Sequence, residues 1–381
     1  MANGSPMKIL QILPALEQGG VERGTVEIAN ALKKAGIENA VISSGGPMVK
    51  ELEALGIPHY TLDAKSKNPF RMHFNARAIA KIARDGGFTL MHARSRAPAW
   101  STLKASKMTG IPMLATYHGI YGTKPAFLKI PYNRVMLKGI GVIAVSGWVK
   151  RHLMETYKTP EDFITLIYRG ADTDRFFPGA ETKERCAEFR ESLGITEDKT
   201  LIVLPGRLTA LKGQEILLDA IGMMKTKNIA CLFVGSDQGR KEYSARLRDI
   251  ASKLPEETQV VFLERSSNMP LVYASGDIIV SASTVPESFG RVITEAQACG
   301  AITIATAHGG ACETIRDGET GFLVPPGDAK ALAAKLDEVV ALPETEKEEI
   351  RKRSAESARE NFSTRKMCEA TIGLYKKIHE V

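Results

Sequence analysis

Short apolar runs alternate with amphipathic stretches along the whole chain, and this pattern predicts strands alternating with helices. The runs in the first half cover residues 8–14, 40–43, 60–62, 89–92, 113–116, 142–145 and 164–172. Those in the second half cover residues 200–204, 231–237, 259–263, 277–281 and 302–305. Apolar residues fill most positions of nearly all of them, as in strands buried on both faces. The pattern therefore predicts the α/β class, with parallel sheets covered by helices on both faces.

A polar connector that ends in proline, residues 172–178, separates the two series of strands. A chain of 381 residues is long enough for two domains, each with its own core. We therefore predict a first domain over residues 1–175 and a second over residues 176–360.

Two carboxylates stand eight residues apart in the segment 286–300, which lies between two predicted strands. We expect a helix to begin near Phe289 or Gly290, with Glu287 in the preceding loop and Glu295 about two turns along. The free N–H groups and the dipole of a helix N-terminus favour an anion, and phosphate is the obvious candidate. The alternative is that both glutamates are ordinary solvated charges.

A second loop, residues 205–213, carries Arg207 and Lys212 between a predicted strand and a helix over residues 214–225. Two fixed positive charges beside a helix N-terminus suit a diphosphate, which they stabilise both when it is bound and when it leaves. A charge pair in a loop is otherwise simply solvated.

Other candidates follow strands of the first half, because ligands of such sheets collect at the carboxyl ends of the strands. Gly19 and Gly20 precede a helix predicted over residues 22–35, and His118 follows the strand 113–116. The alternative for Gly19 and Gly20 is a common glycine turn without a ligand, and the alternative for His118 is a purely structural role. Ser146 is expected only to cap the helix that begins at Gly147.

The segment 286–300 resembles the Glu-x7-Glu motif of the retaining glycosyltransferases of family 4, which have the GT-B fold. Ser288 stands where that family usually has glycine, and Ala301 where it usually has proline. The glycine turn at residues 19–23, the loop at 205–213 and the Gly- and Pro-rich turn at 317–328 are similar to the same family. The resemblance covers the whole chain and is densest from residue 201 to residue 328.

This resemblance implies two Rossmann-like domains that face across a cleft, with a C-terminal helix, residues 361–381, packing back on the first domain. It implies that Glu287 and His118 hold the donor sugar and that Glu295 holds the ribose hydroxyls of a nucleoside diphosphate sugar. Arg207 and Lys212 would bind the diphosphate, and we count them with Glu287 and His118 as catalytic. The remaining donor-binding residues would be Gly19, Gly20, Gly206, Gly235, Ser288, Phe289 and Gly290. Arg169 replaces the asparagine usual in the family, which leaves no role assigned to that position.

Positive charge is concentrated in the first half. The net charge is +7, but the residues from Lys65 to Arg151 include sixteen Lys or Arg and one acid, Asp85. Phe70, Met72, Phe74 and Trp100 are interleaved with them, and residues 68–85 could form a basic amphipathic helix. We therefore expect an anionic partner, first of all an anionic membrane surface, and no nucleic acid, since no recognition motif is present.

Composition, the start of the chain and the spacing of Cys and Asp restrict the cellular location and the cofactors that we expect. No apolar run approaches the roughly 20 residues needed to span a bilayer, and the start of the chain lacks a secretion signal, with Met7 a plausible native start. We expect a cytoplasmic protein that is peripheral on the inner face of the membrane. The five cysteines lack disulfide or zinc spacing and are expected to be buried thiols. The only Asp-x-Asp pair, at 172–174, lies in the connector, so we expect no metal and no cofactor.

The function expected is the retaining transfer of a hexose from UDP-, GDP- or ADP-sugar to a glycan or lipid-linked acceptor, in the synthesis of a bacterial envelope polymer or glycolipid. One alternative is a non-catalytic, two-lobed sugar or nucleotide binding protein, which would predict an export signal. A GT-B epimerase would lack the Glu-x7-Glu signature. A nicotinamide-dependent oxidoreductase would need a Gly-x-Gly-x-x-Gly turn, which is not found after the first strand of either half.

Overall fold

The computed structural model describes residues 6–17, 19–122 and 125–380. The chain divides into two compact units, with boundaries between Arg169 and Gly170 and between Thr364 and Arg365. At both crossings the two connecting segments pair with each other, because Ala171 forms a bridge with Ser363. These two boundaries differ by a few residues from the expected ones, which lie after residues 175 and 360.

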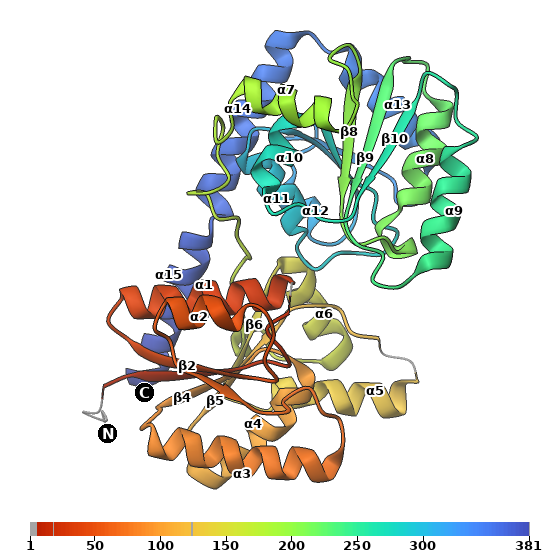
Figure 1. The fold of residues 1–381 in the computed structure, drawn as a ribbon. Coiled ribbons are helices and arrows are strands. Elements are labelled where there is room, and N and C mark those ends of the chain that lie inside the picture. The colour runs from red at the N-terminus through yellow and green to blue at the C-terminus, as the bar shows by residue number, and fades with distance from the viewer. Residues whose placement is uncertain (1–5, 18, 123–124, 381) are drawn as a thin grey trace. The chain divides into compact units, whose positions relative to one another are not determined.

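The first unit is built on a seven-stranded parallel sheet with the order β3-β2-β1-β4-β5-β6-β7 (Figure 1). Its strands are β1 (Lys8–Ile12), β2 (Glu38–Ser43), β3 (His59–Thr61), β4 (Leu90–Ala93), β5 (Met113–Tyr117), β6 (Gly141–Ala144) and β7 (Ile164–Leu166). The strand order reverses at β1, which leaves the carboxyl ends of β1 and β4 side by side. Such a reversal is where sheets of this kind place ligands.

Helices cover both faces of the first sheet. They are α1 (Gly20–Lys34), α2 (Val49–Ala54), α3 (Pro69–Asp85), α4 (Arg96–Thr109), α5 (Ala126–Asn133), α6 (Gly147–Tyr157) and α15 (Thr364–Glu380), with 3₁₀ turns at Arg134–Leu137 and Glu161–Phe163. Leu10 of β1 packs with Ile79 of α3, whereas its neighbour Ile9 packs with Ile28 of α1 and Tyr375 of α15. The alternation follows from the period of two in a strand, and it places the C-terminal helix in the core of this unit.

The second unit has a six-stranded parallel sheet with the order β10-β9-β8-β11-β12-β13. Its strands are β8 (Thr200–Pro205), β9 (Ile229–Val234), β10 (Gln259–Leu263), β11 (Ile278–Ser281), β12 (Ile302–Thr306) and β13 (Phe322–Val324). Its helices are α7 (Lys183–Ser192), α8 (Gln214–Met223), α9 (Lys241–Ala251), α10 (Met269–Ser275), α11 (Arg291–Ala298), α12 (Ala311–Thr314), α13 (Ala329–Ala341) and α14 (Glu344–Asn361), with a 3₁₀ turn at Ala210–Lys212.

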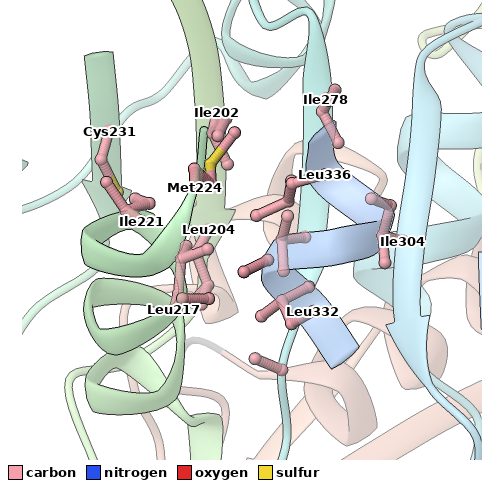
Figure 2. Close-up of a cluster of buried hydrophobic side chains, with 14 of the residues drawn as sticks. Ile202, Leu204, Leu217, Ile221, Met224, Cys231, Ile278, Ile304, Leu332 and Leu336 are labelled. Carbon is pink, nitrogen blue, oxygen red and sulfur yellow. The ribbon is translucent and has the colours of Figure 1, made fainter. Parts of the chain in front are cut away.

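Figure 2 shows the main core of this unit, in which α8 and α13 cover one face of the sheet. Leu217 of α8 and Leu336 of α13 are fully buried with Leu204 of β8 and Ile304 of β12. Burying a leucine contributes roughly 1.5–3 kcal/mol, so this layer holds the central strands in register and fixes the loops at their ends.

Most of the predicted strands and helices are confirmed, and the two parallel sheets confirm the α/β class. The strand expected over residues 164–172 ends at Leu166, and the segment 317–328, expected to be a turn, contains β13. Ser146 caps α6 as expected, since its hydroxyl accepts from the N–H of Val149 at 3.1 Å. The expectation for the cysteines is wrong at two positions, because Cys312 is exposed and Cys186 is partly exposed. Trp100 does not belong to the basic surface either, since it packs against the core of the first unit. Within the described residues, no helix is long and apolar enough to cross a membrane.

Candidate active site

The polar residues predicted in the second half collect at one edge of the second sheet. Four neighbouring strands, β9, β8, β11 and β12, end there, and the loops that follow them carry the candidates. Arg207 and Lys212 follow β8, Gly235 follows β9, and Glu287 follows β11. Because the strands are parallel, their carboxyl ends share one edge, where fold geometry predicts a ligand.

Glu287 and Lys212 form the closest charged contact of this edge. The Lys212 ammonium lies 2.7 Å from Oε1 of Glu287, and the Ser283 hydroxyl donates to the same oxygen. About a quarter of each charged side chain remains exposed, which leaves the pair accessible to a ligand. Burial alone would raise the pKa of Glu287, but the charge and hydrogen bond of Lys212, with smaller help from Ser283 and His308, lower it. Glu287 is therefore an ionised hydrogen-bond acceptor at neutral pH.

The backbone around Glu287 is fixed by two glycines that follow β12. The Gly310 N–H donates to the Glu287 carbonyl at 2.8 Å, and a Cβ added at Gly309 would lie only 2.3 Å from that carbonyl oxygen. His308, which immediately precedes Gly309, donates from Nε2 to the Ser283 carbonyl at 2.9 Å. These contacts hold the loop that presents the carboxylate.

The loop with Arg207 and Lys212 depends on glycine in a similar way. Gly213, at φ +71°, lies so close to Ala282 that an added Cβ would be 1.8 Å from its carbonyl oxygen. The Gln214 side chain donates to the Arg207 carbonyl at 3.0 Å, which fixes the main chain there. The Arg207 side chain itself is exposed and reaches Gln238 at 3.4 Å. The structure thus brings Lys212 to Glu287 but leaves the Arg207 guanidinium extended toward solvent.

Gly206 and Gly235 let the loops after β8 and β9 pack against each other. A Cβ added at Gly235 would lie 2.1 Å from the Gly206 carbonyl oxygen. The Leu208 N–H also donates to the Ser236 carbonyl at 3.0 Å. Gly206 and Gly235, which were predicted to bind the donor, therefore also allow these two loops to pack closely.

Helix α11 begins at Arg291 after Gly290, which has φ +86°, so the predicted helix start is confirmed to within a residue or two. The Phe289 ring is buried against Phe362, so only its main chain can face a ligand. Glu295 lies in the second turn, where Oε1 pairs with Arg291 at 3.3 Å and Oε2 accepts from the Tyr273 hydroxyl at 3.1 Å.

Burial and the Glu295 carboxylate raise the pKa of Tyr273 well above its ordinary value, which keeps its hydroxyl a donor. Glu295 is thus held in one orientation by two side chains that sequence reasoning missed, Tyr273 and Arg291. The spacing of Arg291 and Glu295 by four residues in a helix is the one signal that could have suggested the pair.

The candidates of the first half lie in the first unit. Gly20 is the first residue of α1, and His118 directly follows β5. Arg169, which had no assigned role, donates from Nη1 to Nδ1 of His118 at 3.1 Å and from Nη2 to the Gly20 carbonyl. Burial, Arg94, Arg169 and His92 lower the pKa of His118 well below its ordinary value. His118 is neutral at physiological pH.

A cavity of about 880 Å³ in the second unit does not coincide with this edge. It is lined by Asp277 and Ala301, which directly precede β11 and β12, and by Phe176, Tyr273 and Cys299. It therefore lies at the amino ends of the strands. Among the described residues, no three His, Cys, Asp or Glu side chains gather closely enough to hold a metal ion.

Two family descriptions match the chain. Residues 186–361 match "Glycosyl transferases group 1", and residues 18–175 match "Glycosyltransferase Family 4". A crystal structure of a glycosyltransferase from Rickettsia africae is 40% identical and superposes with a TM-score of 0.90, covering 98% of both chains.

Two further proteins resemble the chain over nearly its whole length. A D-inositol 3-phosphate glycosyltransferase from Rhodococcus erythropolis is 27% identical over 99% of this chain and 87% of its own. The Anabaena protein HepE, crystallised in complex with UDP-glucose, is 22% identical, covers 97% of this chain and 100% of its own, and has a TM-score of 0.83.

Proposed function

Because the chain belongs to glycosyltransferase family 4 and has the two-domain GT-B fold, we propose that it transfers a hexose from a nucleoside diphosphate sugar to a glycan or lipid-linked acceptor with retention at the anomeric carbon. The observation that supports this most directly is the contact between Lys212 and Glu287. It presents a cation for a diphosphate next to a carboxylate for sugar hydroxyls, in one loop cluster at the carboxyl edge of the sheet.

In the proposed reaction, Lys212 and Arg207 stabilise the diphosphate as it departs, and the N-terminus of α11 after Gly290 adds its dipole. The bond between the anomeric carbon and the phosphate oxygen breaks while a bond to the acceptor oxygen forms on the same face. The acceptor proton passes to a phosphate oxygen, so no protein base is consumed. We propose that these cations make a divalent metal unnecessary.

Two carboxylates orient the donor in this proposal. Glu287 accepts hydrogen bonds from sugar hydroxyls, which its low pKa allows over the whole neutral range. Glu295, oriented by Arg291 and Tyr273, accepts from the ribose hydroxyls. His118 of the first unit contributes a hydrogen bond to the donor sugar. Gly19 and Gly20 allow the main chain to approach the ligand.

The test of this function is a thermal-shift series with UDP, GDP and ADP, followed by assays of sugar release from the matching donors. A ligand that binds only the folded chain raises its melting temperature. We expect UDP to give the largest shift, in line with the UDP-glucose complex of HepE, and the shift to be reduced in Lys212→Met. Equal, negligible shifts for all three nucleotides would count against the proposal.

Product analysis separates this function from its alternatives. Transfer to an acceptor, or slow release of free sugar with the α or β configuration of the donor, supports a retaining transferase. Binding without any turnover would indicate a non-catalytic binding protein, and inversion at another sugar carbon would indicate an epimerase.

We further propose that the acceptor side works at an anionic membrane surface, during synthesis of an envelope glycan or glycolipid on the inner face of the membrane. Helix α3 begins after Asn68, whose side chain accepts from the N–H groups of Phe70 and Arg71. Phe70 is 79% exposed and Phe74 is 61% exposed. Phe70, Phe74, Arg77 and Lys81 follow one stripe of the helix at spacings of four, three and four residues. An aromatic and basic stripe of this kind suits the interface of an anionic bilayer.

Vesicle co-sedimentation tests the membrane proposal. The variant carries glutamine at four exposed basic positions, Lys67, Arg71, Arg77 and Lys81. Each basic group near such a surface is worth about 1 kcal/mol, so binding to anionic vesicles should weaken by a few kcal/mol, and added salt should act likewise. The matched control removes four exposed lysines of the second unit, Lys227, Lys253, Lys330 and Lys352. Equal binding of both variants, or no binding by wild type, would refute the proposal.

A further inference from the structure

Arg169 follows β7 and is only 6% exposed, so its guanidinium is held inside the first unit rather than in water. Two of its nitrogens are accounted for by named acceptors. Nη1 donates to Nδ1 of His118 at 3.1 Å, and Nη2 donates to the Gly20 carbonyl at the start of α1. The side chain thus connects the segments that follow β7 and β5 with the first residue of α1.

The chemistry of this contact decides which nitrogen of His118 carries the proton. A guanidinium has five N–H donors and no acceptor, and it stays charged in proteins. Nδ1 of His118 must therefore offer its lone pair, and the neutral ring carries its hydrogen on Nε2. Nε2 is buried and has no hydrogen-bond partner among the described residues. Within the described part of the chain, it is therefore a donor without an acceptor.

The charged and titratable groups that act on His118 oppose its protonation. Arg94 follows β4 and is 1% exposed, Arg169 follows β7, and His92 lies within β4. None of these is a carboxylate. Glu27 of α1 acts on Arg94 and is not among the groups that act on His118. The neutral ring with the hydrogen on Nε2 is consistent with all of these neighbours.

Helix α1 provides the space that the guanidinium needs. Gly24 is buried in this helix, and a Cβ added there would lie 2.6 Å from Nη2 and 2.9 Å from Cζ of Arg169. These atoms are the end of a flexible side chain, so an alanine would displace the guanidinium rather than the backbone. Gly24 and Arg169 therefore form a pair, in which the missing side chain of one admits the other.

We propose that Arg169 is a positioning residue that locks His118 as a neutral donor through Nε2–H, aimed at a hydroxyl or ring oxygen of the bound sugar. His118 then acts as a hydrogen-bond donor and not as a general acid or base. The proposal rests on the function proposed above, because it needs a sugar at this site. The state of the ring, however, can be measured without any substrate.

The first experiment measures the tautomer directly, by ¹⁵N-detected NMR of the histidine side chains in the full-length protein, with His118→Gln used for assignment. Wild type should show one neutral form of His118, protonated on Nε2, throughout pH 5.5–8. Arg169→Met removes the donor but keeps the apolar stem, and it should give a mixture of both tautomers and a visible titration. A wild-type ring protonated on Nδ1, or an unchanged signal in Arg169→Met, would overturn the proposal.

A second variant reaches the same contact without changing Arg169. Gly24→Ala should displace the guanidinium and shift His118 toward the behaviour in Arg169→Met, and it keeps the test valid if Arg169→Met fails to fold. Gly373→Ala in α15 is the matched control, since it gives a helix the same gain in helix propensity and an added Cβ there meets nothing within 4 Å. An effect of Gly373→Ala equal to that of Gly24→Ala would contradict the proposed contact.

Kinetics provide a readout that a purely structural role would not move. In wild type, kcat/KM for donor hydrolysis should show no inflection from His118 between pH 5.5 and 8. In Arg169→Met and Gly24→Ala it should fall roughly two- to tenfold at neutral pH, the value of one hydrogen bond, and gain an acid inflection. A uniform loss at every pH would contradict the proposal. If wild type neither transfers nor hydrolyses a donor, the proposed function fails, while the NMR result still tests the tautomer.

Discussion

The two sheet edges that carry candidate residues handle charge in different ways. At the edge of the second sheet, carboxylates face cations of the same unit at close range, as Glu287 does Lys212 and Glu295 does Arg291. At the edge of the first sheet, Arg94 and Arg169 are buried, Glu27 acts on Arg94, and His118 is kept uncharged. The second edge is an array of fixed charges, and the first is an array of fixed hydrogen-bond donors.

This difference indicates how the work of the proposed reaction is divided. A leaving diphosphate gains negative charge, which paired but accessible cations of the second unit can stabilise. A sugar is uncharged, so a neutral, oriented donor such as His118 can recognise its hydroxyls without carrying a charge itself. Changes on the second edge should therefore alter rate through charge, whereas changes on the first edge should alter hydrogen-bond geometry and its dependence on pH.

The largest effect is expected from removing the cations of the second edge. Lys212→Ala and Arg207→Ala should each lower turnover by about 10²–10³, the usual cost of losing a preorganised charge stabiliser. Lys212 should lie at the upper end because its loss also leaves Glu287 without its cation, whereas the exposed Arg207 side chain reaches Gln238. The measurement is kcat for transfer or donor hydrolysis.

Lys253→Ala is the control for these variants, since this exposed lysine follows the end of α9 and precedes β10, on the side of the amino ends of the strands. It should leave the rate unchanged. Wild-type turnover in either Arg207→Ala or Lys212→Ala would remove that residue from the site and would weaken the contrast between the two edges.

A smaller effect should separate the two carboxylates within the second edge. Glu295→Ala should weaken nucleotide binding by roughly 10- to 100-fold, since hydrogen bonds from a ligand to a charged group are worth about 1.5–3 kcal/mol. Glu287→Ala should instead lower kcat with little change in nucleotide affinity, because sugar contacts can tighten as the bond breaks. Calorimetry with the nucleotide and steady-state kinetics measure the two quantities. Identical losses in both quantities at the two sites would contradict the assignment.

Much of the second edge could be predicted from the sequence because its residues are local. Arg207 and Lys212 share one loop, and Glu287 and Glu295 belong to one strand-to-helix junction. The spacing within each segment was therefore enough to predict that its two residues lie near each other. The partners that orient them could not be predicted in the same way. Tyr273 reaches Glu295 from 22 residues away, and Lys212 meets Glu287 across 75 residues.

Most contacts of the first edge could not be predicted from the sequence either, because they join residues that are far apart along the chain. The contacts of Arg169 join it to His118, 51 residues away, and to Gly20, 149 residues away. An arginine in place of the usual asparagine suggested a lost role, whereas the fold gives it new partners. Gly24 provides the space that the Arg169 guanidinium occupies. This role of Gly24 can be recognised only when the residue that packs against it is known. Such pairs become visible only once the strand order is known.

The smallest expected effect is a dependence of stability on pH that comes from the first unit. His92 is fully buried between the Tyr375 and Thr116 hydroxyls, at 2.5 and 2.7 Å, and burial and Arg94 lower its pKa well below the ordinary 6.5. Below about pH 6.5 the unfolded chain binds a proton at this position that the folded chain does not. The free energy of unfolding should therefore fall as the pH drops, by at most about 1.4 kcal/mol per pH unit for this group.

The carboxylate of the second edge changes stability in the same direction but at lower pH, since the lowered pKa of Glu287 confines the loss of its contribution to the range below the ordinary 4.5. Between pH 7.5 and 5.0, urea unfolding should thus report histidines and not Glu287. Other histidines with a lowered pKa, among them His59, His152 and His308, add to the same slope, so variants must separate them. Thr116→Val should lower stability at every pH but keep the wild-type slope, because His92 stays buried and neutral. His92→Gln should reduce the slope, and an unchanged slope in that variant would show that His92 is not a source of acid sensitivity.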